Sequence, residues 1–102
     1  MNDIVEFKRW VAVRWGRKKL FGNKALAIMT LGLCGEAGEV SEPIKKELRG
    51  DGPVDIEKLT LELGDVLHYL MCIALHYRIS VVDIMEKNMM KLDARDKRKK
   101  AK

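Results

Sequence analysis

The stretch that decides the fold spans residues 55–77 and reads DIEKLTLELGDVLHYLMCIALHY. Its apolar residues recur at the period of an α-helix, and they lie nearly all round it. Helices of this kind are buried at the centre of a protein. Asp55 is a suitable N-cap, because a carboxylate there accepts hydrogen bonds from the first free backbone N–H groups. We therefore predict a central, buried helix over this stretch.

Three further helices are predicted from the same period and from residues that start and stop helices. The four expected helices cover about residues 3–20, 24–49, 55–77 and 81–95. The sequence RGDGP at 49–53 is rich in turn formers, and SVVD at 80–83 is typical of a capping box. No stretch alternates as a strand does. The expected fold class is all-α, with the helices forming an antiparallel four-helix bundle.

Glycine and proline interrupt the apolar pattern of the second helix. Gly32, Gly35 and Gly38 fall at every third position, and each costs roughly 1 kcal/mol in a helix interior. We predict that a neighbouring helix backbone approaches this face closely. Pro43 lacks an amide hydrogen and clashes with the carbonyl four residues earlier, so a kink or break is expected there.

The 102 residues suit one domain, and 47% hydrophobic with 34% charged residues is ordinary globular composition. A domain of this size has a thin core, which favours self-association. The formal net charge is +5, and residues 96–102 hold five positive charges and one negative. We expect a domain over residues 1–95 and a solvated, frayed basic tail over 96–102, with a nucleic-acid contact as the lesser interpretation.

The two cysteines and the N-terminus point to one cellular compartment. Cys34 and Cys72 lie in apolar runs, and we interpret them as buried free thiols in a reducing cytosol. The N-terminus has no signal-peptide pattern, and the apolar stretch 66–75 is too short to span a bilayer. The expected location is cytoplasmic.

Four acids stand in unusually apolar surroundings. Glu36 and Glu39 share one face of the second helix, and Glu62 and Asp65 share one face of the third. If these helices pack side by side, the four carboxylates converge and require a cation. Mg²⁺ suits them, because it prefers carboxylate oxygens and retains water and phosphate ligands. The alternative is that the acids lie on solvated helix faces.

Three stretches together carry a family resemblance. LGLCGEAGEV at 31–40 resembles the first motif of MazG-type nucleotide pyrophosphohydrolases, and ELGDVLHYL at 62–70 resembles the second. NMMKLDAR at 88–95 is similar to the closing segment of that family. The resemblance covers about residues 25–95. Gly35 stands where many members carry a further acid, which indicates a subgroup of the family.

The resemblance implies a reaction, a metal and an assembly. It implies Mg²⁺-dependent hydrolysis of (deoxy)nucleoside triphosphates to the monophosphate and pyrophosphate. Glu36, Glu39, Glu62 and Asp65 would be the catalytic metal ligands, with Glu39 or Glu36 taking the proton of the attacking water. Family members complete their active sites as dimers or as dimers of dimers, so a homodimer or homotetramer is expected.

A triphosphate is a polyanion, so positive and polar side chains should surround the acids. The candidates for substrate binding are Lys45, Lys46, Asn88, Lys91, Arg95 and Trp10. The alternative for each of these positive side chains is that it lies on the solvated surface and does not bind substrate. Trp10 could stack on a base, although packing in the core is the favoured interpretation. His68 and His76 are expected to be structural.

Several functions stay open at this point. House-cleaning of non-standard or surplus nucleotides is favoured over the related phosphoribosyl-ATP step of histidine biosynthesis. A non-catalytic helical module could instead use the basic tail for a nucleic-acid or protein partner. The partial Asp-x-x-His pattern at 65–68 also suggests a third function, a metal-binding helical bundle with other chemistry. Such a bundle usually carries two patterns of this kind, and the sequence has only this partial one.

Overall fold

The computed structural model describes residues 3–101, and over that range the chain forms four helices and no strand. The helices are α1 (Ile4–Gly16), α2 (Gly22–Leu48), α3 (Ile56–His76) and α4 (Val81–Ala101). The expected all-α fold class is confirmed. Residues 1, 2 and 102, which belong to the expected domain and basic tail, lie outside the described residues.

Side chains in the loops start three of the helices. The Asp3 carboxylate accepts hydrogen bonds from the backbone N–H groups of Val5 and Glu6 at 2.9 and 3.0 Å. Asp55 accepts one from the N–H of Lys58 at 3.1 Å, as the sequence predicts. The Ser80 hydroxyl accepts one from the N–H of residue 83 at 3.4 Å, which is one half of the expected capping box.

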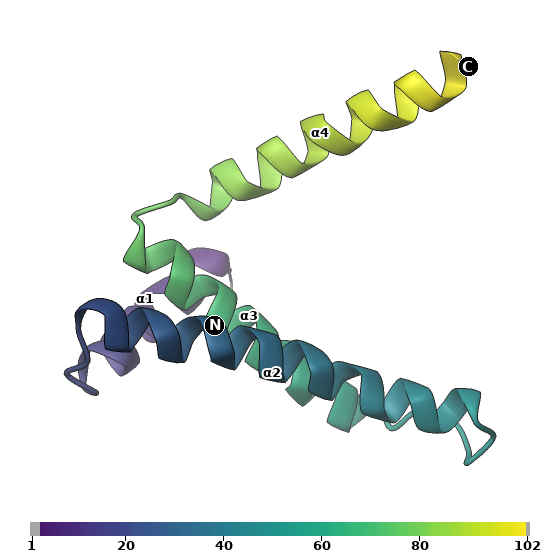
Figure 1. Ribbon diagram of the computed structural model, residues 1–102, viewed down its shortest axis with the longest axis horizontal. Helices are drawn as coiled ribbons and strands as arrows, with labels where there is room; N and C mark the ends of the chain where they lie inside the picture. Colours follow the sequence, from purple (N-terminus) through teal and green to yellow (C-terminus); the bar gives the residue numbers. More distant parts are fainter. Residues whose placement is uncertain (1–2, 102) are drawn as a thin grey trace.

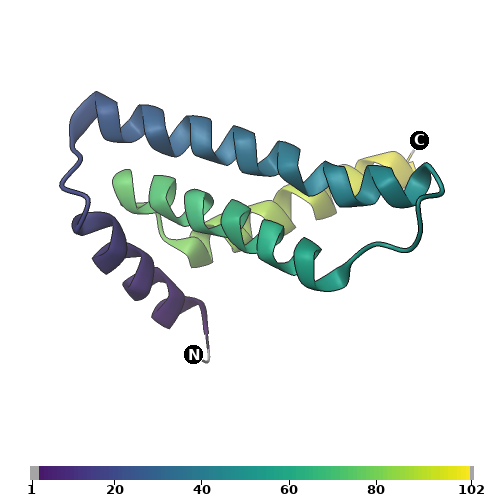
Figure 2. The same cartoon turned by 90° about the horizontal axis from the view of Figure 1, so that it is seen from below.

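Helices α2 and α3 form an antiparallel hairpin, and α1 packs against α3 (Figures 1 and 2). The loop between α2 and α3 reverses the chain at Gly50 and Gly52, whose φ angles are 94° and 114°. Glycine adopts this left-handed region without the steric cost that other residues meet. The turn predicted at 49–53 is therefore confirmed, and it places the C-terminal half of α2 beside the start of α3.

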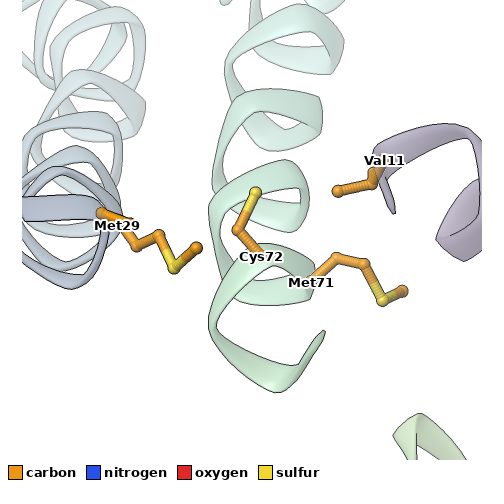
Figure 3. Packing of buried hydrophobic residues seen from close by; sticks show 5 residues of the cluster. Val11, Met29, Met71 and Cys72 are labelled. Carbon is orange, nitrogen blue, oxygen red and sulfur yellow. The ribbon is translucent and has the colours of Figure 1, made fainter. Parts of the chain in front are cut away.

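The small core lies where α1, α2 and α3 meet. Figure 3 shows α3 between the other two helices, with Met71 and Cys72 facing Val11 of α1 and Met29 of α2. These four side chains are at most 3% exposed. The buried thiol predicted for Cys72 is confirmed, whereas Cys34 is exposed and its prediction is wrong. An apolar flanking sequence does not bury a residue whose helix face lacks a neighbour.

Helix α2 does not break at Pro43, and the close approach expected on its glycine face involves a side chain. The helix continues without a break through Pro43, which is buried beside the loop that joins α2 to α3. Proline removes one hydrogen bond from a helix of 27 residues, and the helix continues on both sides of it. Gly32 does face a close neighbour, but that neighbour is the ring of Tyr69 and no backbone. Gly35 and Gly38 have nothing within 4 Å of an added Cβ.

Helix α3 is less buried than its sequence predicts. Leu61, Leu63 and Leu67 are 67%, 50% and 40% exposed, so these apolar side chains of α3 are not covered within the chain. By length and composition alone, α3 is also long and apolar enough to cross a membrane. Its last three turns nevertheless hold the core residues Met71 and Cys72 against α1 and α2.

Helix α4 extends away from the other three helices (Figure 1). One chain therefore forms a three-helix layer with a projecting arm, and the expected four-helix bundle does not form within it. Arg78, with a φ of 56°, turns the chain away at the end of α3. Residues 96–101 continue α4 as helix, so the expected frayed conformation is wrong for this part of the tail.

Candidate functional site

Three of the four predicted acids come together at the α2–α3 hairpin. Glu36 of α2 and Glu62 and Asp65 of α3 each offer a carboxylate oxygen, and these oxygens lie within 4.8 Å of one another. The antiparallel pairing of the two helices brings the motifs face to face. Glu39 lies one turn further along α2, is exposed, and stands outside this group.

The electrostatics of the group favour a bound cation. Partial burial raises the pKa of Glu36 above its usual value, and the negative charges of Asp65, Glu62 and Glu39 raise it further. A hydrogen bond with the Asp65 carboxyl acts in the same direction. The protein therefore disfavours the fully ionised group, and a hard cation with oxygen ligands relieves this repulsion.

A pocket of about 400 Å³ lies directly beside the acids. Glu36 and Asp65 form part of its wall, so the acid group and the pocket are one continuous site. The opposite wall comes from α1, which contributes Phe7 and Trp10. The two rings stack with centroids 6.1 Å apart and planes inclined by 22°. An aromatic wall next to clustered carboxylates suits a ligand that has a flat ring and a charged, metal-binding part.

Trp10 does not pack in the core, contrary to the favoured interpretation of its sequence. It is 50% exposed and lines the pocket, whereas its neighbour Val11 is the buried residue of α1. Adjacent positions on a helix point in directions about 100° apart, so only one of the two can enter the core. The pocket position agrees with the other interpretation of Trp10, in which its ring stacks on a base.

Arg14 and His68 are pocket residues that sequence reasoning missed. Nη1 of Arg14 lies 3.4 Å from Nε2 of His68, and the His68 ring packs edge-on against Trp10 and Tyr69. Burial lowers the pKa of His68, and the positive charges of Arg14 and Lys18 lower it further. The pair joins residues 54 positions apart, so no local pattern could have revealed it.

The predicted cations and the amide lie elsewhere in the single chain. Lys45 and Lys46 are exposed on the last turns of α2 and do not line the pocket. The side chains predicted on α4 are exposed on the arm that projects from the layer; they are Asn88, Lys91 and Arg95. Within one chain the structure does not bring these five residues to the acids, and their roles stay predictions.

Comparison with known proteins agrees with this geometry. The sequence profile of the MazG nucleotide pyrophosphohydrolase domain matches residues 25–99, which include all four acids. The chain belongs to the MazG family. MazG proteins are nucleoside triphosphate pyrophosphohydrolases, so this chain is a hydrolase at the level of its family.

One curated relative of this MazG protein is the Gene 37 protein of Mycobacterium phage L5. The two are 37% identical over 79 residues, which cover 74% of this chain and 69% of the phage protein. The name of that protein states no activity. No solved structure matches this chain significantly. Helix α1, which supplies the aromatic wall and Arg14, precedes the stretch that the MazG profile matches.

Proposed function

We propose that this MazG protein hydrolyses (deoxy)nucleoside triphosphates to the monophosphate and pyrophosphate with Mg²⁺, as a house-cleaning enzyme of the nucleotide pool. The observation that carries the proposal is the convergence of Glu36, Glu62 and Asp65 beside a pocket with an aromatic wall. A triphosphate chain would lie at the acids, and the base would enter the pocket. The scale of the site, about 400 Å³, suits a ligand of this size.

The carboxylates fit a magnesium site. Glu36, Glu62 and Asp65 would hold the ion, because carboxylate oxygens are its preferred ligands and their mutual repulsion needs a cation. When bound, Mg²⁺ neutralises charge on the triphosphate and activates water for attack. Glu39 is exposed and lies outside the close group of acids. We therefore favour Glu39 over Glu36 as the base that takes the proton of the attacking water.

A second copy of the chain is part of the proposal, because one chain leaves much apolar surface exposed. Its accessible surface is 8027 Å², whereas a compact monomer of this mass exposes about 5,900 Å². Its radius of gyration is 16.8 Å, against about 13 Å for a compact domain of 100 residues. A stable interface needs only about 800 Å² from each partner. The excess surface is therefore sufficient for a homodimer.

Helix α4 offers the surface through which the copies would meet. Val82, Met85, Met89 and Leu92 are spaced three and four residues apart, as on the apolar seam of a helix that packs against another helix. Val82, Met85 and Met89 are 45–58% exposed in the single chain. We propose that α4 of one copy packs on the α2–α3 layer of the other. This packing would bring Asn88, Lys91 and Arg95 to the triphosphate.

The reaction is tested with a panel of standard and modified nucleoside triphosphates and phosphoribosyl-ATP in the presence of Mg²⁺. Monophosphate and pyrophosphate are measured together, because their equal release identifies cleavage between the α and β phosphates. Glu36→Gln should abolish release. Glu47→Gln, an exposed carboxylate of α2 that does not line the pocket, should retain it.

Two results would overturn the proposal. If the folded, magnesium-loaded protein releases no pyrophosphate from any compound, the chain is a binding module. Loss of nucleic-acid binding on removal of residues 97–102 would then support that function. Activity with iron and none with magnesium would instead indicate a metal-binding bundle with other chemistry.

A further inference from the structure

The pocket beside the acids contains the guanidinium of Arg14, a group that only donates hydrogen bonds. Arg14 projects from α1, and its Nη1 lies 3.4 Å from Nε2 of His68 on α3. Among the described residues the Arg14 side chain makes no other hydrogen bond or ion pair. A guanidinium has five N–H donors and no acceptor, so this contact leaves most of its donors unused beside the pocket.

His68 restricts the orientation of the guanidinium through this contact. Because Arg14 can only donate, Nε2 of His68 must accept, and the ring proton is then on Nδ1. Nδ1 lies 4.0 Å from the buried Sγ of Cys72. The ring is also held edge-on between Trp10 and Tyr69, with centroid distances of 6.1 and 5.3 Å. These contacts limit the positions that the ring, and hence the guanidinium, can take.

A donor-only group beside a stacking surface discriminates between purines. Guanine presents two adjacent acceptors, N7 and O6, which a guanidinium can bind together. Adenine presents the acceptor N7 beside an amino group that is itself a donor. A guanidinium therefore cannot bind the two adenine positions together. Both rings would stack on the half-exposed Trp10 in the same way. The edge of the base is therefore the feature that Arg14 can distinguish.

We propose that Arg14, positioned by His68, selects guanine nucleotides over adenine nucleotides in the pocket between α1 and α3. This inference rests on the proposed function, because a triphosphate at the acids places its base in the pocket. Arg14 precedes the stretch that the MazG profile matches. The selection therefore comes from the part of the chain that lies outside the matched domain.

The experiment compares kcat/KM for dGTP and dATP, together with calorimetric binding of GMP and AMP, which are not hydrolysed. A good bidentate hydrogen bond to the correct base gives about a tenfold preference or more. The wild type should therefore prefer dGTP to dATP, and GMP to AMP, by about tenfold. Arg14→Met should reduce both ratios to near one. Arg9→Met, an exposed cation of α1 that does not line the pocket, should keep them.

Variants of His68 test its positioning role. His68→Phe retains a ring but offers Arg14 no acceptor, so the guanine preference should fall. His68→Gln restores an acceptor and should recover part of the preference. A purely structural role of His68 would lower the activity with dGTP and dATP equally and leave their ratio unchanged, and this outcome would overturn the inference.

The remaining outcomes separate this inference from the proposed function. If no nucleotide is hydrolysed but GMP binds more tightly than AMP through Arg14, the inference stands and the proposed function fails. If Arg14→Met weakens both purines equally, Arg14 acts on phosphate or on folding, and the inference is wrong. Equal binding of GMP and AMP by the wild type would also overturn it.

Discussion

The ring of Tyr69 occupies the space that a side chain at position 32 would fill. A Cβ added to Gly32 would lie 2.6 Å from Cζ of Tyr69, which is closer than carbon atoms approach without displacement. Gly32 therefore allows the Tyr69 ring to lie against α2, where it also contacts the edge of His68. The absence of a side chain at position 32 thus allows Tyr69 to form part of the wall of the pocket beside the acids.

Gly32→Ala should destabilise the protein relative to Gly38→Ala. Alanine gains about 1 kcal/mol over glycine in a helix, and Gly38 has open space at its Cβ. At position 32 the displacement of Tyr69 opposes that gain. Thermal or urea unfolding of the two variants measures the difference in the free energy of unfolding. Equal stabilisation by both substitutions would contradict the contact.

Met71→Ala should cost about 2–5 kcal/mol of unfolding free energy, because it removes a fully buried side chain and leaves a cavity. Met90→Ala is the control, since Met90 is 70% exposed on α4, and substitutions at exposed positions change stability by about 0.5 kcal/mol or less. Urea unfolding gives both changes in unfolding free energy, provided that the dependence of this free energy on urea concentration is the same in the two variants. Similar costs at the two positions would mean that the core lies elsewhere.

Magnesium should stabilise the folded protein through Glu36. A ligand at 100 times its dissociation constant adds about 2.7 kcal/mol to the free energy of unfolding. Glu36→Gln should lose most of this gain, while Glu47→Gln should keep it. In metal-free buffer Glu36→Gln should be at least as stable as the wild type, because it removes repulsion from Asp65 and Glu62. Thermal unfolding with and without Mg²⁺ tests both statements, and an undiminished response of Glu36→Gln to the metal would refute them.

Stability near neutral pH should depend on His68. Burial and the charges of Arg14 and Lys18 lower its pKa below 6.5, more than the charge of Asp65 raises it. The unfolded chain therefore binds a proton at a higher pH than the folded chain does. The contribution of His68 is present above pH 6.5 and is lost as the pH falls through its lowered pKa.

The measurement is the difference in melting temperature between the wild type and His68→Gln from pH 5 to 8. The wild type should lose more stability than the variant as the pH falls. The Cys72 thiol, 4.0 Å from the His68 ring, does not interfere, because burial raises its pKa above 9.0 and it stays protonated across this range. Parallel curves for the two proteins would show that His68 does not titrate as its surroundings predict.

Charges on the α4 seam should separate the copies of the chain. Met85→Glu and Met89→Glu place carboxylates among the apolar residues of that seam, whereas Met90→Glu alters an exposed methionine beside it. Sedimentation should show monomers for the first two variants and a dimer for the third. Pyrophosphate release should fall along with the dimer. A monomeric wild type with full activity would contradict the shared site.

The sequence by itself determined the helices, their caps, the glycine turn and the identity of the acids. These features depend on interactions within a few residues: the period of the apolar positions, the Asp55 cap, and the positive φ angles at 50 and 52. The spacing within each acid pair is equally local. A single helix places residues three apart on one face whatever surrounds it.

Only the tertiary structure decided which side chains of different helices contact one another. Which of Trp10 and Val11 enters the core, whether Cys34 is covered and what fills the space at Gly32 depend on the rotation of one helix against another. The Arg14–His68 contact joins segments 54 residues apart and leaves no local pattern. The direction of α4 is set in the turn after α3, where Arg78 has a φ of 56°, and the apolar period of α4 does not reveal it.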